Sequence, residues 1–426
     1  MEPKKAREAV LEHLRAGTIA QIYANTYYSL LDRVSETGCF PESVGPGGYG
    51  AVMFCRTTGG IDALLRETGE YAADEKIIRF ALDSARRMGL NRIPHIAHEI
   101  QTDAAGKVTQ EFSTDDQADG ELHVILAYAR LVLSGRASKD FEDAYYPDVK
   151  AYLDKLMRQP YFYYEEHCPV DVYPFMFPPE SLKLIFNCAL EHSRENRRWS
   201  VFDLLTQSFG GAALEAMAGV AEKRGDGESA AFWRGRLRLL TEGIDRYMTR
   251  EIDGKKVYLE MRIPDGGWGR PFTGMSWINF SPVAAGWQGL PPEVLDHTIQ
   301  YIRRKIWREA PYTNGRYYMA TEFNEDGGVN PNILGKVIGW DLAYSARKED
   351  YAHILSWIEF LEEVNRCDLL AENLSPADGE WKIADGGNGE QCSWWCWGMA
   401  VLRASLGLPP APERPAGGNP PALGSN

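Results

Sequence analysis

Acidic, glycine and tryptophan residues crowd one stretch near the C-terminus, AENLSPADGEWKIADGGNGEQCSWWCWGM at residues 371–399. Glu372 and Glu390 stand 18 residues apart, a run of glycines precedes the second acid, and three tryptophans follow it. Two carboxyl groups on opposite sides of a sugar ring are the minimal machinery of glycoside hydrolysis, since one protonates the leaving oxygen and the other acts as base or nucleophile. Aromatic rings beside them stack on the apolar face of a pyranose and raise the pKa of the acid. The stretch therefore predicts a carbohydrate-processing site.

Further acids lie beside aromatic residues at predicted helix starts and loops: Asp119, Glu191, Glu195 and Glu322. Most acids on helices are solvated surface groups. Glu191 and Glu195 are four residues apart and so share a helix face, and the arginines around them favour a surface salt-bridge cluster. Glu372 differs, because it lies between the apolar CDLLA and NLSPADG at the mouth of a predicted loop. From this context, Glu372 is as well explained by a functional role as by a place on the solvated surface.

Cofactor motifs are weak or missing. The HIAHE segment at 95–99 has HxxH spacing but lacks the HExxH order of a zinc site. We find no GxGxxG, no P-loop GK[ST] and no GxSxG. Arg56, in MFCRTTGG between an apolar run and a helix start, either caps a loop or holds a substrate hydroxyl. We therefore expect no metal and no organic cofactor.

Composition narrows the partners and the compartment. A formal net charge of −14 argues against binding to nucleic acid or to an anionic membrane. No run of 18 apolar residues predicts a membrane span, and residues 1–20 lack the apolar core of a signal peptide. Seven cysteines without a CxxC pair indicate reduced thiols. We expect a cytoplasmic protein whose partner is a small carbohydrate, and whose oligomeric state the sequence does not indicate.

Helical periodicity dominates the chain and must position these residues. Short turns join the predicted helices in pairs: 59–71 with 72–90, 120–135 with 138–159, 202–225 with 227–248, 282–289 with 291–306, and 333–347 with 349–364. Residues 5–34 are predicted as one long helix and 391–406 as the last. Residues 159–179 and 250–272 are predicted short strands or hairpins, and 409–426 a loose Pro/Gly-rich tail. The prediction is a single all-α domain over 1–408, an (α/α)6 toroid of helical hairpins with short β-hairpin insertions, whose long loops gather at one face.

The 371–399 stretch resembles the C-terminal signature of the six-hairpin glycosidases, which include trehalases, processing α-glucosidases and mannosylglycerate hydrolases. ENLSPADG matches its Glu, Pro and Gly at Glu372, Pro376 and Gly379, and GGNGEQ matches its glycine run and second acid at Glu390. WWCWGM matches the start of the closing helix. The resemblance implies Glu372 as the catalytic base and Glu390 as a residue that contacts sugar.

Upstream segments are similar to other motifs of these families. EHSRENRRW at 191–199 resembles the general-acid segment, one residue shorter and with Glu where trehalases have Asp, as in glucoamylase-type enzymes. This implies Glu195, or else Glu191, as the general acid. QADG resembles a glucoamylase motif at Gln117 and Asp119, and MFCRTTGG resembles another at Arg56. Thr57 replaces an Asp of the family, so we expect a specificity unlike that of trehalase or glucoamylase.

These observations predict an exo-acting, inverting glycoside hydrolase for an α-linked glycoside of a short saccharide or glycoconjugate. Inversion needs carboxyl groups about 6.5–9.5 Å apart, and retention about 5–5.5 Å. The DGGWGRPF segment is predicted as a flexible loop that carries a tryptophan over the sugar. The predicted pocket residues are Arg56, Gln117, Asp119, Trp268, Glu390 and Trp394.

Three other functions stay open. A sugar epimerase on the same toroid would need paired histidines, for which His95, His98, His123 and His192 are the candidates. An unsaturated-uronide hydrolase would need one Asp and no opposed base. The third possibility is a carbohydrate-binding toroid without catalysis.

Overall fold

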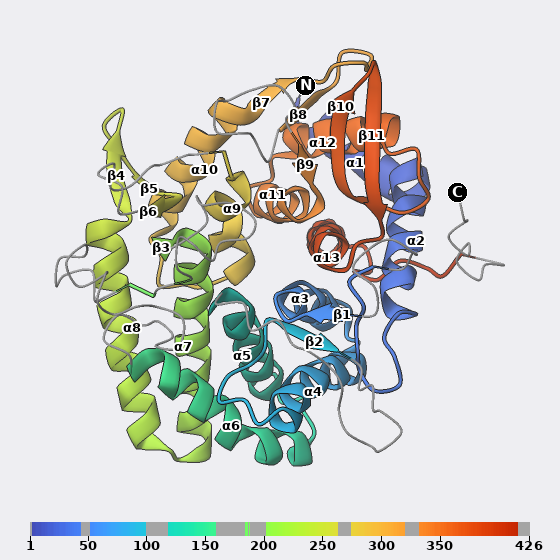
Figure 1. Cartoon of the computed structure of the whole chain (residues 1–426). Coiled ribbons are helices and arrows are strands. Elements are labelled where there is room, and N and C mark those ends of the chain that lie inside the picture. The colour runs from blue at the N-terminus through green and yellow to red at the C-terminus, as the bar shows by residue number, and fades with distance from the viewer. Residues whose placement is uncertain are drawn as a thin grey trace. The chain divides into compact units, whose positions relative to one another are not determined.

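The structure, a computed structural model of the whole chain, is described for residues 2–43, 52–98, 118–158, 184–185, 187, 202–262, 274–319 and 332–415 (Figure 1). These residues divide into two compact units. The terminal unit comprises Met1–Met53, Gly60–Asp74 and Arg303–Asn426, and the central unit comprises Phe54–Gly59 and Glu75–Ile302. None of the described helices is long and apolar enough to cross a lipid bilayer.

The described residues form two kinds of helix, which alternate along the chain from α2 onward. Six helices are buried on all sides over most of their length: α3 Thr57–Thr68, α5 Ala118–Leu133, α7 Leu204–Arg224, α9 Ser276–Ala285, α11 Gly335–Arg347 and α13 Gly389–Ser405. The remaining helices bury one face and leave the other polar: α1 Pro3–Ala16, α2 Thr18–Leu31, α4 Tyr71–Arg87, α6 Lys139–Arg158, α8 Gly227–Tyr247, α10 Pro292–Ile306 and α12 Tyr351–Val364. An all-round buried helix belongs inside a fold and an amphipathic one at its surface. Each hairpin from α3 to α12 therefore supplies one inner and one outer helix.

In the central unit, α7 packs against α5, α8 and α9, and Figure 1 shows α7 and α8 side by side in green. Small residues permit this crowding. A Cβ on Gly211 would lie 2.4 Å from the Trp287 ring, and one on Gly210 would lie 2.1 Å from Ile185 Cδ1. The predicted strands in 250–272 include a hairpin of β4 Thr249–Ile252 and β5 Lys255–Tyr258. The other strands are β2 Ile96–His98, and β3 Phe202–Asp203 paired with β6 Met261–Arg262; β1 Val52–Phe54 is divided between the two units.

In the terminal unit, α11 packs on α13 with their backbones in close contact, and Figure 1 shows the two helices side by side in orange and red. Two glycines make this possible, because a Cβ on Gly339 would lie 2.1 Å from the Trp394 carbonyl oxygen and one on Gly398 would lie 2.2 Å from the Gly339 carbonyl oxygen. The helices α1 and α2 pack on α12 and α13. A three-stranded antiparallel sheet in the order β11-β10-β9 leads into this pair, with β9 Ile333–Leu334, β10 Ala371–Ala377 and β11 Glu380–Gly386. A separate hairpin joins β7 Trp307–Glu309 to β8 Tyr317–Met319.

The prediction of one helix over 5–34 is wrong, because the chain breaks at Gly17 into α1 and α2. Gly17 is extended, with φ −75° and ψ 166°. Glu362 of α12 accepts a hydrogen bond from the Ile19 amide at 2.9 Å, and its other oxygen lies 2.9 Å from His13 Nδ1. A Cβ on Gly17 would lie 2.5 Å from the same carboxylate, so only glycine leaves room for this cap.

The helix predicted at 282–289 is also displaced. The observed α9 begins at Ser276, carries Pro282 inside, and ends at Gly286 with φ 60°. Proline usually opens a helix, which is why the sequence pattern placed the start too late. The other predicted pairs agree with the observed helices to within a few residues. The predicted strands at 159–179 lie outside the described residues.

The tail does not begin as a loose extension. The hydroxyl of Tyr23 donates to the Pro410 carbonyl at 2.8 Å, and that of Tyr28 donates to the Pro412 carbonyl at 2.9 Å. Arg414 lies over the Tyr28 ring and pairs with Asp32. Residues 409–414, which we call the C-terminal strap, are thus fastened to α2. Proline carbonyls accept hydrogen bonds readily, although the proline nitrogen cannot donate one.

Candidate active site

Glu372 lies on a strand, whereas the sequence had suggested the mouth of a loop. Residues 371–377 and 380–386 pair as an antiparallel hairpin, and Asp378 and Gly379 turn it with φ 54° and 86°. An Asp-Gly pair with both φ values positive is typical of a two-residue type I′ turn. Glu372 is half-buried next to Asn373, which pairs with β11 on one side and with Leu334 of β9 on the other. The local backbone of Glu372 is therefore held from both sides.

The glycine run forms a tight corner between β11 and α13. Gly387, with φ 80°, donates its amide to the Leu370 carbonyl at 2.7 Å. Asn388 then caps α13, because its side chain accepts from the Gln391 amide at 2.9 Å. Gly389 donates to the Glu42 carbonyl at 2.7 Å, and a Cβ on it would lie 3.3 Å from Glu42 Cα. These contacts fix where α13 begins.

Glu390 follows this corner in the first turn of α13 and belongs to a buried charged cluster. Its Oε1 lies 3.1 Å from Lys336 Nζ, at the start of α11. Its amide donates to Glu42 Oε1 at 3.0 Å. All three side chains are buried. The family signature contains Glu390 but neither Glu42 nor Lys336, and no local pattern distinguishes a buried lysine from the usual exposed one.

The tryptophans of α13 lie in the core of the terminal unit. Trp394 is 1% exposed, and its ring meets those of Trp340 and Trp397 nearly at right angles, with centroids 5.4 and 5.5 Å away. Trp395 is fully buried against Tyr23. Trp394 thus offers almost no surface on which a sugar could stack. It follows Glu390 by four residues, so the two side chains share a face of α13.

In the central unit the structure brings together two predicted pocket residues, Arg56 and Asp119. Arg56 Nη1 lies 3.4 Å from Asp119 Oδ2, and both side chains are buried. Asp119 is in the first turn of α5, where the helix dipole favours a negative charge. The next residue, Gly120, brings α5 against the backbone of Arg56, because a Cβ there would lie 3.3 Å from the Arg56 nitrogen.

A further buried acid, Asp203, lies within electrostatic range of Asp119. It caps α7, accepting from the Thr206 amide at 2.7 Å and from the Thr206 hydroxyl at 2.9 Å. Burial, aided by the negative charge of Asp119, raises the pKa of Asp203 to about 6, although hydrogen bonds from Thr206 and Asn187 oppose the shift. The Asp and Thr three residues apart in FDLLT are visible in the sequence as a helix cap. Nothing in that pattern indicates the raised pKa.

Buried polar side chains recur at the starts of the inner helices. Since a helix start carries unsatisfied amide groups, it is a suitable place for acceptors and for ligand oxygens. Examples are Thr57 and Thr58 on α3, Glu121 and His123 on α5, Gln207 on α7, Ser276 and Asn279 on α9, and Gln391 and Ser393 on α13.

Two of the histidines proposed for an epimerase, His95 and His123, pack against aromatic rings. His123 meets Phe209 edge to face, with centroids 3.9 Å apart, and His95 meets Phe54 at 5.4 Å. Within the described ranges, no group of three or more His, Cys, Asp or Glu residues is arranged to hold a metal ion.

Several predicted site residues lie outside the described residues: Gln117, Glu191, His192, Glu195, Trp268 and Glu322. The separation between the two predicted catalytic carboxyl groups therefore stays a prediction.

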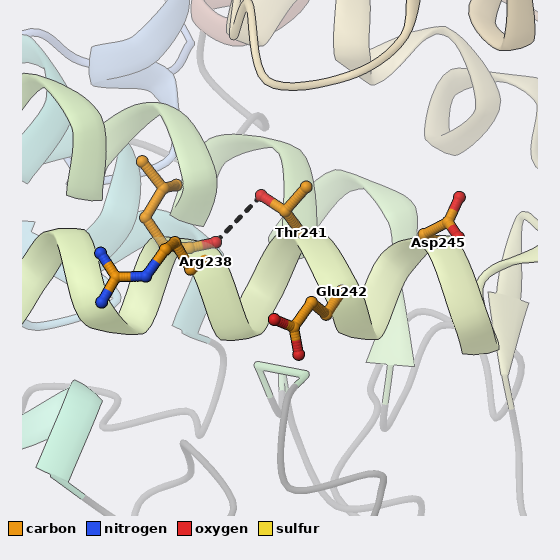
Figure 2. A pocket seen from close by; sticks show the side chains of 5 residues that line it. Arg238, Thr241, Glu242 and Asp245 are labelled. Atoms are coloured by element: carbon orange, nitrogen blue, oxygen red, sulfur yellow. Dashed lines mark hydrogen bonds between the residues drawn. The ribbon is translucent and has the colours of Figure 1, made fainter.

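A hollow of about 510 Å³ on α8 contains none of the predicted residues. Figure 2 shows that its walls come from one helix, where Thr241 donates a hydrogen bond to the Leu237 carbonyl at 2.9 Å. Arg238, Glu242 and Asp245 complete the lining. One helix cannot enclose a sugar ring, so this open hollow is not the candidate site.

Comparison with known proteins identifies the fold. No protein-family model and no curated protein sequence matches the chain. Among solved structures, a metal-independent α-mannosidase of Streptococcus pneumoniae, complexed with α-1,6-mannobiose, matches 95% of this chain and 97% of its own at a TM-score of 0.61 and 12% identity. A bacterial glucoamylase complexed with acarbose matches at a TM-score of 0.59 and 12% identity, over 92% of this chain. The fold is the (α/α)6 toroid of the six-hairpin glycosidases.

The six-hairpin fold confirms the fold class predicted from the helical pattern, and it agrees with the family resemblance. A third match is a mannosylglycerate hydrolase of Thermus thermophilus complexed with glucose, with a TM-score of 0.53 and 12% identity over 89% of this chain and 99% of that one. The chain spans only 56% of the glucoamylase that it matches. The mannosidase and the mannosylglycerate hydrolase are instead matched over nearly their full lengths.

Proposed function

We propose that this chain is an exo-acting, inverting glycoside hydrolase that cleaves an α-linked glycoside of a short saccharide or glycoconjugate. One observation supports the proposal: in a chain with a six-hairpin fold, the acids that match the family signature lie on a paired hairpin, Glu372, and on the inner helix that follows it, Glu390. Neighbours with this fold were solved with acarbose, mannobiose and glucose.

Glu372 is the proposed general base. It removes a proton from a water molecule, which attacks the anomeric carbon from the face opposite the leaving group and inverts the configuration. Glu195, or else Glu191, is the proposed acid, which protonates the leaving oxygen. A base must keep its position while the water attacks, and the pairing of Asn373 with both neighbouring strands supports this for Glu372.

The proposed sugar contacts come from charged groups that are already held in place. Arg56 keeps the Asp119 carboxylate oriented, and charge-assisted hydrogen bonds from sugar hydroxyls to such a carboxylate are strong. The Glu390 carboxylate accepts a hydrogen bond from another sugar hydroxyl in the same way. Gln117 and Trp268 remain proposed contacts from the family resemblance and the sequence, and Trp394 is proposed to support Glu390 from the core.

Replacing Glu372 by Gln tests the base. We expect kcat to fall by about 10²–10⁴-fold, because the amide cannot accept the proton, while sugar binding persists. The measurement is hydrolysis of a panel of nitrophenyl α- and β-glycosides and natural disaccharides, with the product anomer followed by NMR. The matched control is Glu380→Gln on β11 of the same hairpin, whose side chain is 55% exposed and pairs with Lys382. Full activity of Glu372→Gln would refute the role of Glu372.

The same panel identifies the acid. An aryl glycoside with an acidic leaving group needs little protonation, whereas a disaccharide needs it fully. The acid is whichever of Glu191→Gln and Glu195→Gln loses disaccharide hydrolysis but keeps dinitrophenyl glycoside hydrolysis. If the parent hydrolyses no α- or β-glycoside, the hydrolase proposal fails. A retained product anomer would overturn inversion alone.

A further inference from the structure

Lys336 occupies a position where a lysine is costly. It is the second residue of α11, and it is 3% exposed. The start of a helix carries a partial positive charge, which repels an ammonium group. Burial adds the cost of removing that ammonium from water. A leucine or methionine would avoid both costs, so the lysine calls for an explanation beyond packing.

Two contacts join Lys336 to the start of α13. Its Nζ lies 3.1 Å from Glu390 Oε1, and its amide donates to Gln391 Oε1 at 3.0 Å. Two consecutive residues of α13 thus hold the side chain and the backbone of one residue of α11. On the other side, the Glu42 carboxylate accepts from the Glu390 amide at 3.0 Å. Glu390 is therefore fixed at both its backbone and its carboxylate.

The scaffold around this pair is rigid. A Cβ on Gly335 would lie 3.1 Å from the Gln391 carbonyl oxygen, so the backbones of the two helix starts nearly touch. Lys336 also lies two residues beyond Leu334, which pairs with Asn373, the neighbour of Glu372. The start of α11 is thereby connected to both acids of the family signature through short, fixed backbone segments.

We infer that Lys336 is a positioning residue that orients the Glu390 carboxylate toward a hydroxyl of the sugar. The inference rests on the proposed hydrolase function and adds to it a residue that no sequence motif indicates. The Lys336 ammonium neutralises the buried Glu390 carboxylate, which lies close to another buried acid, Glu42. The long lysine side chain spans the distance from α11 to α13. Without it, the buried Glu390 carboxylate would lose an ion pair that orients it.

The test uses Lys336→Met, which keeps the length of the side chain and removes its charge. We expect KM to rise about tenfold or more with kcat changed much less, because the lost contact serves ground state and transition state alike. Lys336→Arg, which keeps the charge, should recover part of the loss. Lys382→Met is the control, since Lys382 lies on β11, is largely exposed, and pairs with Glu380.

A double variant separates positioning from a purely structural role. If Lys336 acts through Glu390, Lys336→Met combined with Glu390→Gln should raise KM no further than the worse single variant. Additive effects, or a lower melting temperature with an unchanged KM, would overturn the inference.

A binding measurement separates this inference from the hydrolase proposal. Calorimetry with the product monosaccharide in the Glu372→Gln background needs no turnover, and Lys336→Met should weaken binding there about tenfold. A parent that neither hydrolyses glycosides nor binds sugars refutes the hydrolase and this inference together. A parent that does both, with unchanged binding in Lys336→Met, refutes this inference alone.

Discussion

Buried aspartates in this protein show how partners, and not burial alone, decide the behaviour of a residue. Asp203 is held by the amide and hydroxyl of Thr206, and burial raises its pKa to about 6. Asp341 on α11 accepts from Arg303, His353 and the Trp357 indole. Burial alone would raise the pKa of Asp341, but Arg303 and His353 outweigh it and hold the pKa below its usual range.

The raised pKa of Asp203 predicts a pH-dependent stability. The unfolded value for Asp is about 3.9, so the folded state binds more protons between about pH 4 and pH 6. The contribution of Asp203 is fully present below pH 4 and is lost as pH rises through 6. Asp203→Asn keeps an oxygen cap and removes the charge, so it should be more stable than the parent at pH 8, by on the order of 1–3 kcal/mol. Urea unfolding at pH 4 and pH 8 measures the difference, which should vanish at pH 4.

Asp341→Asn is the matched comparison, and we expect it to change the stability at pH 8 in the opposite direction. Because its folded pKa is depressed, Asp341 contributes stability above about pH 4 and loses it as pH falls. The variant should lose about 3–5 kcal/mol at pH 8, since it leaves Arg303 without its buried carboxylate. Equal, pH-independent effects of the two variants would contradict this account.

At the scale of elements, glycines determine where helices break and chains turn, which the helical pattern of the sequence does not predict. The hairpins α3–α4, α5–α6, α7–α8 and α11–α12 were predictable, because amphipathic outer helices display the 3.6-residue period. The break at Gly17 depends on Glu362, which lies hundreds of residues away in sequence, and no local pattern contains it. The hairpin at 371–386 was mistaken for a loop because Pro376 and the glycines interrupt the strand pattern.

The residues of the candidate site also divide into those that local sequence patterns predict and those that they do not. Glu372, Glu390, Arg56 and Asp119 were found through motifs, and the last two are indeed in contact. Lys336, Glu42 and Asp203 were missed, because the burial of a charged side chain depends on which helix start packs beside it. That information is distributed over the whole fold.

Because α11 and α13 pack so closely, we expect that adding one methyl group between them lowers the stability of the protein strongly. In Gly398→Ala the new Cβ would lie 2.2 Å from the Gly339 carbonyl oxygen, and a backbone atom cannot move aside as a side chain can. We expect a loss of about 1–3 kcal/mol or more in the free energy of unfolding, measured by urea titration. Gly235→Ala is the control: Gly235 lies inside α8, where the nearest atom is the flexible Arg238 guanidinium at 3.8 Å. It should gain about 0.5–1 kcal/mol from helix propensity, and a similar loss in both variants would exclude the backbone clash as the cause.

At the scale of the whole molecule, the terminal unit joins the two ends of the sequence. The helices α1 and α2 pack on α12 and α13, and the C-terminal strap is bonded to two tyrosines of α2. The central unit is built almost entirely from one continuous stretch, Glu75–Ile302. The terminal unit therefore depends on contacts of very long sequence separation.

The strap predicts that hydroxyl groups on α2 stabilise the protein. Tyr23→Phe with Tyr28→Phe removes both donors to the strap and leaves two proline carbonyls without these partners. We expect a loss of about 1–3 kcal/mol, read from thermal or urea unfolding. Tyr317→Phe is the control, because that side chain is exposed on β8. If the double variant is as stable as the control, the strap does not contribute to folding through these bonds.

The divided terminal unit also sets an order of events during synthesis. Its first helices leave the ribosome early, yet α12, α13 and the strap lie beyond Arg303. At about 5–20 residues per second, the roughly 320 residues between α2 and α12 take on the order of 15–65 seconds to make. During that time the apolar side chains of α2 have none of their final C-terminal partners, while the central unit already has nearly all of its own residues. The earliest helices are thus the last to be buried, and an unfinished or C-terminally truncated chain exposes the surface that chaperones and proteases recognise.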